Sequence, residues 1–351
     1  MKIVDDYEVV ADRLYNEHLA DKLNGKRVLV TGASGLIGSQ ICKSIILCNE
    51  KHGTNINVVL HDISLDFLKS RYGEELDRSY VDTLVGDIRV PFSYEKEVDF
   101  IIHCASSTSS KYFITNPVET IDILMSGTKN MLEFARKKEV KGFVYLSSLE
   151  IYGDVFDDKI NVDENAYHYL DFLNIRSSYP EGKRMCECMC SAYASEYKLP
   201  VFIARLAQTI GSDVSINDGR AFAEFARCAV QGKDIVLKSK GGTVRNYCDI
   251  ADTTAALFYV LTKGEPGNAY NVANRSTLCS IKEFAELFCK LSPHDIKVVF
   301  DLSQDPEKLG YQHEIKVKLD PSKIEKLGWK PIFSLEDTIN KLIAKFTEKL
   351  N

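Results

Sequence analysis

A tyrosine and a lysine four residues apart, Tyr179 and Lys183, are the clearest candidates for chemistry in this sequence. Residues at this spacing lie on one side of a helix, and Pro180 is tolerated if it falls in the first helical turn. A free tyrosine is a poor base at neutral pH because its pKa is about 10. A nearby ammonium group, together with a cationic cofactor ring, would lower that pKa. The pair is therefore expected to take the proton of an alcohol as hydride leaves the same carbon.

A glycine-rich turn at residues 31–38, T-G-A-S-G-L-I-G, supplies a site for the hydride acceptor. Three glycines at three-residue spacing allow a tight turn and a close approach to a pyrophosphate. The N-terminus of the following helix offers free N–H groups and the positive end of the helix dipole to that anion. Because the turn lies between a predicted strand and an apolar helix, it predicts a dinucleotide-binding site.

An acidic residue selects between the two nicotinamide dinucleotides. Asp62 closes the second predicted strand, 24 residues after Gly38, where a carboxylate accepts hydrogen bonds from ribose hydroxyls. A 2′-phosphate would be repelled there, so the sequence favours NAD over NADP. Gly86-Asp87-Ile88 fits the edge of an adenine site. The residues expected to contact the cofactor are Gly32, Ser34, Gly35, Leu36, Ile37, Gly38, Asp62, Ile63, Ser64, Asp87, Ile88, Ala105, Ser106, Ser107, Tyr179 and Lys183.

The elements that must position these residues alternate between short β-rich runs and amphipathic helices. This alternation is typical of a parallel sheet covered by helices on both faces. A serine pair, Ser147-Ser148, ends the fifth predicted strand. The predicted strands are 27–30, 56–60, 83–85, 98–103, 142–146 and 201–204, and the predicted helices are 36–48, 117–138, a helix after Tyr179, 221–230 and 253–261.

The expected fold class is α/β, a Rossmann-type doubly wound parallel sheet with a smaller mixed C-terminal substrate lobe. Residues 1–26 are expected to form an N-terminal helical segment, and residues 27–205 the NAD-binding domain. Residues 206–351 are expected to form mainly the substrate-binding lobe, with elements that return to the sheet.

Composition excludes several classes of protein. A net charge of -6 and a pI of about 5.8 argue against a nucleic-acid binder. No apolar run reaches the roughly 18 residues that a membrane helix needs, and the N-terminus has no signal-like apolar region, so a cytoplasmic protein is expected. The cysteine cluster Cys186, Cys188 and Cys190 would diverge around a helix, and we expect no metal site there.

These motifs resemble those of the extended short-chain dehydrogenases/reductases, the NAD-dependent epimerase/dehydratase family that acts on nucleotide sugars. The resemblance covers most of the chain from Arg27 to Pro331. Within this family the sequence looks most like the UDP-glucuronate decarboxylases. Five segments carry that likeness: 115–121, 127–132, 179–184 (Y-P-E-G-K-R), 217–220 (N-D-G-R) and 245–252 (R-N-Y-C-D-I-A-D). The resemblance implies a homodimer that pairs through the helices at 117–138 and 179–197. The residues expected to contact the substrate are Lys111, Tyr112, Gln208, Thr209, Arg220 and Arg245, the two arginines gripping its diphosphate.

The run S-S-L-E-I-Y-G at 147–153 separates the subfamilies. The 4,6-dehydratases have S-T-D-E-V-Y-G, in which the Asp and Glu expel water across C5 and C6. Decarboxylases keep the Glu and replace the Asp by Ser, whereas typical 4-epimerases lack the Glu. Here Glu150 is present and Leu149 stands in place of the acid. Because leucine cannot protonate a leaving hydroxyl, 4,6-dehydration is disfavoured.

Three departures from the decarboxylase pattern leave the sugar and the nucleotide open, although a UDP-sugar is favoured. Leu124 stands where those enzymes have Asn, and Gln208-Thr209-Ile210-Gly211 stands where they have N-T-F-G. The loop 106–112 lacks their S-P. All three lie at or near positions that the resemblance places beside the substrate.

The expected mechanism is a cycle in which NAD is retained. Tyr179 acts as base on the sugar C4 hydroxyl, Lys183 tunes it and Ser148 holds the oxygen. A uronic acid would become a β-keto acid and lose carbon dioxide, with Glu150 positioning the substrate or assisting proton delivery. The alternative is a nucleotide-sugar 4-epimerase. A 4,6-dehydratase is less favoured, and so is a non-catalytic NAD-binding regulator, against which the intact Ser148, Tyr179 and Lys183 argue.

Overall fold

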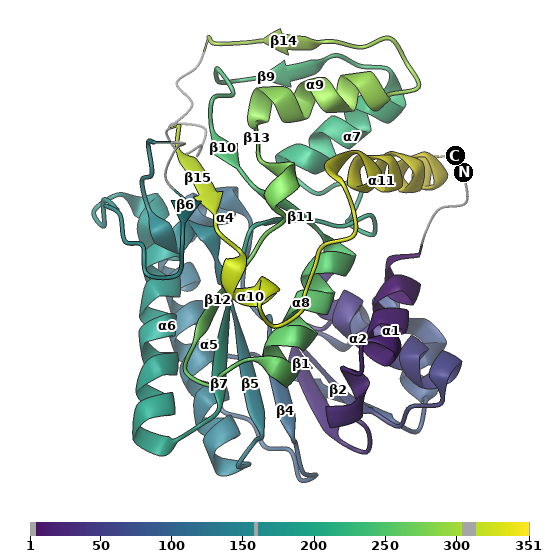
Figure 1. Ribbon diagram of the computed structural model, residues 1–351, viewed down its shortest axis with the longest axis vertical. Coiled ribbons are helices and arrows are strands. Elements are labelled where there is room, and N and C mark those ends of the chain that lie inside the picture. The colour runs from purple at the N-terminus through teal and green to yellow at the C-terminus, as the bar shows by residue number, and fades with distance from the viewer. Residues whose placement is uncertain (1–4, 158–160, 304–313, 351) are drawn as a thin grey trace.

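The computed structural model describes residues 5–157, 161–303 and 314–350. Its centre is a seven-stranded sheet in which every neighbouring pair is parallel, in the order β12-β7-β5-β4-β1-β2-β3 (Figure 1). The predicted doubly wound α/β fold is therefore confirmed. The strands are β1 Arg27–Thr31, β2 Asn57–Asp62, β3 Val81–Val85, β4 Phe100–His103, β5 Gly142–Ser148, β7 Val201–Leu206 and β12 Ala269–Val272.

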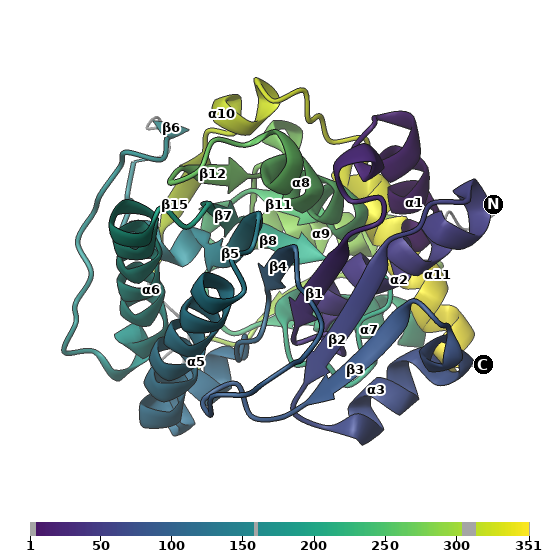
Figure 2. The ribbon, with the colours of Figure 1, turned by 90° about the horizontal axis from the view of Figure 1, so that it is seen from below.

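Helices cover both faces of this sheet, as Figure 2 shows. On one face lie α2 (Leu36–His52) and α8 (Ile250–Lys263), with α1 (Asp6–Asn16) packed outside them. On the other lie α5 (Pro117–Lys137) and α6 (Ser178–Tyr197), side by side. Successive residues of β1 enter opposite cores, because Val28 and Val30 pack with the first layer and Leu29 with the second. Since both faces are buried, the inner strands are continuous apolar runs.

The remaining elements form a smaller mixed lobe beyond the carboxyl end of the sheet. Its helices α7, α9 and α11 pack around a separate apolar core. Three small sheets complete it, in the orders β13-β10-β15-β6, β11-β8 and β14-β9. The helices of the lobe are α7 Ala221–Gln231, α9 Ile281–Leu291 and α11 Leu335–Leu350, whereas the short α10 (Ser322–Glu325) packs on β12 and α8. The strands are β6 Asn161–Val162, β8 Gln208–Ile210, β9 Ile235–Leu237, β10 Val244–Arg245, β11 Tyr247–Asp249, β13 Cys279–Ser280, β14 Val298–Phe300 and β15 Lys316–Leu319.

Several element limits differ from the predicted ones. The second strand runs on to Asp62 and the fifth to Ser148, which brings both residues to the carboxyl edge of the sheet. The fourth begins at Phe100 rather than at residue 98. Helix α8 begins three residues before the predicted start, at Ile250, because the Asp249 side chain caps it by accepting from the Ala251 N–H. The predictions did not include α3 (Leu65–Tyr72), α9, α10 or α11, and they treated residues 106–112 as a loop, whereas α4 (Ser110–Thr115) begins within it.

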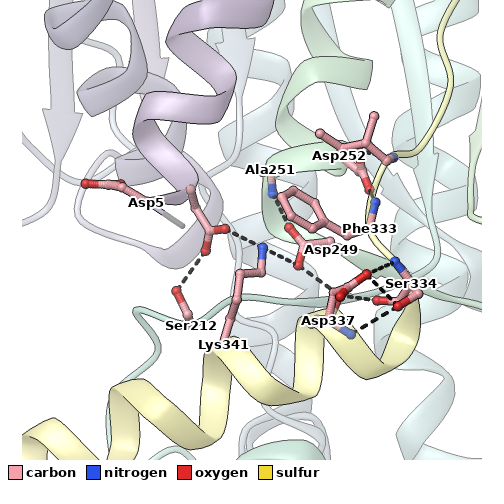
Figure 3. A network of polar contacts seen from close by, with 12 residues as sticks. Asp5, Ser212, Asp249, Ala251, Asp252, Phe333, Ser334, Asp337 and Lys341 are labelled. Atoms are coloured by element: carbon pink, nitrogen blue, oxygen red, sulfur yellow. Dashed lines mark hydrogen bonds and ion pairs between the residues drawn. The ribbon is translucent and has the colours of Figure 1, made fainter. Parts of the chain in front are cut away.

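The N-terminal helix is attached to the lobe and to α8 by buried charges. Lys341 of α11 lies between Asp249 and α1, where its Nζ contacts Asp6 Oδ1 at 2.5 Å and Asp249 Oδ2 at 2.8 Å (Figure 3). A second pair joins Arg13 Nη1 to Asp252 Oδ1 at 3.1 Å. Removing one partner of a buried pair leaves an uncompensated charge, so these contacts hold α1 firmly in place. The limits of the three predicted domains stay predictions.

Two other sequence expectations concern what the fold does not contain, and a third concerns the cysteines of α6. Within the described ranges, no helix combines the length and apolarity that crossing a membrane would require. The same residues hold no group of three or more His, Cys, Asp or Glu side chains suited to a metal ion. On α6, Cys186 and Cys190 are buried whereas Cys188 is exposed, as the helical spacing predicts. A cytoplasmic location stays a prediction.

Candidate active site

The predicted base lies at the start of α6, beside the end of β5. Tyr179 is the second residue of the helix, so Pro180 falls in the first turn as expected. The Tyr179 ring is buried and stacks on Phe113, with centroids 4.2 Å apart and planes 10° apart. Burial raises the pKa of Tyr179, and the Glu150 carboxylate raises it further. A hydrogen bond with the Ser148 side chain opposes that rise. The structure therefore brings Ser148 and Tyr179 together as predicted.

Lys183 is buried one helical turn further on. Its Nζ donates to the Leu146 carbonyl at 2.7 Å and lies 4.7 Å from the Tyr145 ring centroid and 5.8 Å from that of Tyr179. Burial lowers the pKa of Lys183 to about 8. The protein alone does not provide the expected lowering of the tyrosine pKa, because burial outweighs the groups that lower it. The same expectation included a second cation, the nicotinamide ring of bound NAD, as a group that lowers the tyrosine pKa.

A partner that sequence reasoning missed holds the predicted glutamate. Arg176 donates from Nη1 to Glu150 Oε2 at 2.8 Å and from Nη2 to Glu150 Oε1 at 3.0 Å. The two side chains are only 11% and 15% exposed. Burial would raise the pKa of Glu150, but the Arg176 guanidinium outweighs it and the pKa is lowered. Glu150 is therefore an ionised carboxylate in a fixed position.

The two arginines expected to bind diphosphate differ in their surroundings. Arg245, on β10, acts on Glu150 by lowering its pKa, so it lies near the catalytic residues. Its Nε is buried and, among the described residues, has no hydrogen-bond partner. Arg220 is paired with Asp218, from Nε to Oδ1 at 3.0 Å and from Nη2 to Oδ2 at 2.8 Å. Arg245 thus keeps a free donor for an anion, whereas Arg220 must first leave its carboxylate.

The glycine turn has the geometry that a dinucleotide requires. Gly32 has a φ of +65°, and a Cβ there would lie 3.0 Å from the Ala105 backbone. A Cβ on Gly38 would lie 2.1 Å from the Gly32 carbonyl oxygen. Helix α2 begins directly after Gly35, so its free N–H groups face the turn. The turn and its helix therefore fit a pyrophosphate, as the sequence predicts.

Asp62 lies against this turn. Its Oδ2 accepts from the Ser34 N–H at 2.9 Å and from Ser34 Oγ at 2.7 Å, and its Oδ1 accepts from the Ile63 N–H at 2.9 Å. Ser64 caps α3 by accepting from the Asp66 N–H. The carboxylate is thus aimed at the turn, with lone pairs left for ribose hydroxyls.

The loop after β4 is fixed by a residue of β1 that sequence reasoning also missed. Thr31 Oγ1 accepts from the N–H groups of Cys104 and Ala105, both at 3.1 Å, and lies 2.7 Å from His103 Nδ1. Burial lowers the pKa of His103 to about 3, so the ring is neutral and its Nδ1 can accept the threonine proton. This places Ala105 directly against Gly32. Further along the loop, Ser106 Oγ donates to the Ser107 carbonyl at 2.9 Å.

The other predicted cofactor contacts lie at the end of β3. Asp87 pairs with Arg89, whose Nη2 is 2.6 Å from Asp87 Oδ2. Ile88 is buried against α5, where Asn130 Nδ2 donates to its carbonyl at 3.0 Å and a Cβ on Gly127 would lie 2.9 Å from its Cγ2. Ile88 is therefore held close to α5, which leaves Asp87 as the polar group at this edge.

The four other predicted substrate residues come from two separate elements. Lys111 and Tyr112 lie on α4 (Ser110–Thr115), the helix that also carries Phe113. Gln208 and Thr209 lie on β8, where Gln208 is paired in register with Tyr247 of β11. Thr209 is buried and its Oγ1 donates to the Ala207 carbonyl at 3.3 Å. Thr209 thus supports the strand, while Gln208 is half-buried.

With this geometry established, comparison with known proteins identifies the class. The family model described as "NAD dependent epimerase/dehydratase family" matches residues 28–273. The chain therefore belongs to that family, and the predictions of the family and of NAD as cofactor are confirmed.

Relatives and solved structures narrow the likeness. The chain is 29% identical over 329 residues to UDP-glucuronic acid decarboxylase 1 of Danio rerio, covering 93% of this chain and 73% of that protein. It is 28% identical over 327 residues to UDP-glucuronic acid decarboxylase 6 of Arabidopsis thaliana, covering 92% and 90%. The fold matches a dTDP-glucose 4,6-dehydratase from Streptomyces venezuelae with a TM-score of 0.78 at 22% identity, covering 92% and 97%. It also matches a Bacillus cereus UDP-glucuronic acid 4-epimerase with a TM-score of 0.76 at 19% identity, covering 93% and 100%.

Proposed function

We propose that this chain oxidises C4 of a UDP-sugar transiently with NAD, and that its reaction is the decarboxylation of UDP-glucuronate. The observation that carries the proposal is the grouping of Ser148, Tyr179 and Lys183 beside a fixed Glu150, with the buried Leu149 in place of a second acid. The relatives named UDP-glucuronic acid decarboxylase, which align with more than nine-tenths of the chain, support the choice of substrate.

In this mechanism Tyr179 takes the proton of the C4 hydroxyl while Ser148 holds the same oxygen by a hydrogen bond. The glycine turn and Asp62 would hold NAD, which would supply the hydride acceptor for this oxidation and the hydride donor for the final reduction. Lys183, with a pKa of about 8, places a positive charge beside the tyrosine ring when protonated. Stacking on Phe113 keeps Tyr179 in one orientation throughout the cycle.

A ketone at C4 makes the uronic acid a β-keto acid, which loses carbon dioxide from C5. Negative charge then develops on the C4 oxygen, where the protonated Tyr179 and Ser148 stabilise it by hydrogen bonding, and C5 takes up one proton from water to replace the lost carboxylate. We assign Glu150 to positioning the substrate rather than to delivering a proton, because Arg176 holds it as a carboxylate. Leu149 offers no acid for a leaving hydroxyl, which argues against 4,6-dehydration.

We assign binding of the nucleotide part of the substrate to the smaller lobe. Arg245 is proposed to bind the diphosphate, since its buried Nε has no partner among the described residues. Arg220 is proposed as a second contact, which requires exchange of Asp218 for phosphate. Gln208, Thr209, Lys111 and Tyr112 stay proposed substrate contacts.

Mass spectrometry of the products from a panel of UDP-, dTDP-, GDP- and CDP-sugars tests the proposal. With UDP-glucuronate we expect a UDP-pentose and one equivalent of carbon dioxide. Turnover of another sugar nucleotide but not of UDP-glucuronate would refute the substrate assignment. NAD binding without turnover of any sugar nucleotide would indicate a non-catalytic protein.

A 4-epimerase is the second candidate, and the Arg176–Glu150 pair favours it. Inversion at C4 needs only Tyr179, Ser148, Lys183 and the cofactor, and it makes no use of an additional proton donor. Its product has the same mass as the substrate. Chromatographic separation of an isomer, without release of carbon dioxide, would select this candidate over the decarboxylase.

A further inference from the structure

The Asp213 carboxylate joins α1 and α11, the first and last helices that the structure describes, to the part of the molecule expected to bind the cofactor. Asp213, in the segment after β8, accepts from the Tyr7 hydroxyl of α1 at 2.8 Å and from Arg71 Nη1 of α3 at 2.6 Å, both at Oδ2. Its Oδ1 lies 3.5 Å from Lys349 Nζ of α11. Burial and then Asp213 itself raise the pKa of Tyr7, so the phenol remains a neutral donor. Four separate segments therefore meet at Asp213.

Helix α3 carries this connection into the glycine turn. Arg71 Nε donates to the Ser34 carbonyl at 3.2 Å, and the next residue, Tyr72, donates from its hydroxyl to the Ala33 carbonyl at 2.6 Å. Asp62 in turn accepts from the Ser34 N–H and hydroxyl. The peptide group between Ala33 and Ser34 is thus held at both its carbonyl and its N–H, and the carbonyl of the next peptide group is held by Arg71.

The segment that carries Asp213 also packs on the start of α2. A Cβ on Gly211 would lie 2.8 Å from Leu36 Cδ1, at the first residue of that helix. The next residue, Ser212, donates to Asp6 Oδ2 at 2.7 Å, and Asp6 is held by Lys341 (Figure 3). Residues 211–213 therefore connect the helix N-terminus expected to bind pyrophosphate with the anchored N-terminal helix.

We propose that Asp213 is a positioning residue for the cofactor site, fastening the glycine turn to α1 and α11 so that NAD is held through successive turnovers. The inference rests on the proposed function, because a cycle that returns the hydride to its own substrate leaves the cofactor unchanged and has no need to release it. The turn binds through backbone N–H groups, whose directions depend on the peptides at Ala33 and Ser34. Fixing these peptides in advance lowers the ordering that binding requires and slows dissociation.

The test measures cofactor release directly. NADH is bound to the full-length chain, excess NAD is added in a stopped-flow instrument, and the loss of bound NADH fluorescence gives the dissociation rate. Asp213→Asn keeps the side-chain shape and removes the charge, and Tyr7→Phe removes one donor to Asp213 without touching the turn. For Asp213→Asn we expect release about fivefold faster, the factor that corresponds to the upper range for a partly exposed ion pair. Tyr7→Phe should accelerate release in the same direction by a smaller factor.

A matched control, Asp12, lies on α1, the helix that also carries Tyr7. Asp12 binds Lys51 at 2.8 Å and His52 at 2.8 Å, both on α2, through contacts that do not involve α3 or the glycine turn. Asp12→Asn removes a comparable charge from α1 and should leave the release rate unchanged. Melting temperatures of all variants show whether loss of stability alone explains the result.

A release rate for Asp213→Asn within about 1.5-fold of that of the unmodified chain would overturn the proposal. Loss of an ion pair that held the site should accelerate release by more than this factor. Equal acceleration by Asp12→Asn would overturn it too, because any loosening of α1 would then suffice. If Asp213→Asn does not fold, Tyr7→Phe decides by the same criterion. Failure of the unmodified chain to turn over UDP-sugars would refute the proposed function without affecting this measurement.

Discussion

Arg176 and Glu150 form a largely buried two-point ion pair, with nitrogen–oxygen distances of 2.8 and 3.0 Å. The pair lies beside Tyr179, on whose pKa its two members act in opposite directions, Glu150 raising it and Arg176 lowering it. It gives the site a carboxylate that the protein itself holds in place. The first prediction concerns this pair.

Arg176→Met should destabilise the protein by about 3 kcal/mol at pH 7, because it leaves the Glu150 charge buried without a partner. The double variant Arg176→Met with Glu150→Gln should recover much of that loss. Urea unfolding of the four proteins of this cycle measures the coupling. Arg176 lowers the folded-state pKa of Glu150 below its ordinary value of 4.5. The contribution of the pair to folding stability is therefore fully present above pH 4.5 and is lost as the pH falls through the folded-state pKa. Additive losses in the double variant would contradict the prediction.

Tyr179→Phe should leave folding and NAD binding nearly unchanged, because the ring still stacks on Phe113. Turnover should fall by about 10² to 10⁴-fold, as expected for loss of a general base. Steady-state kinetics with the substrate identified by mass spectrometry makes the measurement. If the variant kept more than about a tenth of the original turnover, the base would have to be sought elsewhere.

Lys183→Met should change how stability depends on pH. Burial lowers the folded-state pKa of Lys183 from 10.5 to about 8, so the folded protein loses this proton at a lower pH than the unfolded chain does. The unfolded state binds more protons between these values, and the stability of the unmodified protein relative to Lys183→Met should rise from pH 8 to pH 10.5. Unfolding midpoints at pH 7 and at pH 10 or slightly below test this, and a constant difference between the proteins would count against it.

Asp62→Ala should narrow the preference for NAD over NADP. The carboxylate faces the turn through Ser34 and would repel a 2′-phosphate, so its removal should improve NADP binding more than NAD binding. Dissociation constants for both dinucleotides, measured by calorimetry on both proteins, give the result. Equal affinity for NADP and NAD in the unmodified protein would refute the assignment.

We predict a homodimer paired through α5 and α6. Large hydrophobic side chains on these helices are exposed, among them Val118 by 71%, Ile121 by 46% and Met185 by 50%. Figure 2 shows the two helices side by side on one flank of the sheet, where a second copy has access to both. Val118→Asp with Met185→Glu should give a monomer, whereas exchange of the exposed Val236 for Asp should not. Light scattering at micromolar concentration checks this, and a monomeric unmodified protein would rule the prediction out.

Much of the site was predictable because it is local in sequence. The glycine turn depends on a strand, three glycines and a helix within a dozen residues, and Tyr179 and Lys183 depend on the helical repeat. The order of strands and helices likewise predicts a parallel sheet covered on both faces, because apolar periodicity is a property of each segment by itself. Such features do not require knowledge of which distant segments meet.

The partners of these residues depended on the tertiary structure. Arg176 meets Glu150 across 26 residues of sequence, and Arg71 meets Asp213 across 142. Arginine and aspartate at such separations are indistinguishable in sequence from the many charged residues that remain in solvent. Whether Glu150 is an acid or a fixed carboxylate depends on which cation packing brings to it and on how much water is excluded around the pair. Both are decided by contacts between segments far apart in the chain, because charge and burial act through space and not along the sequence.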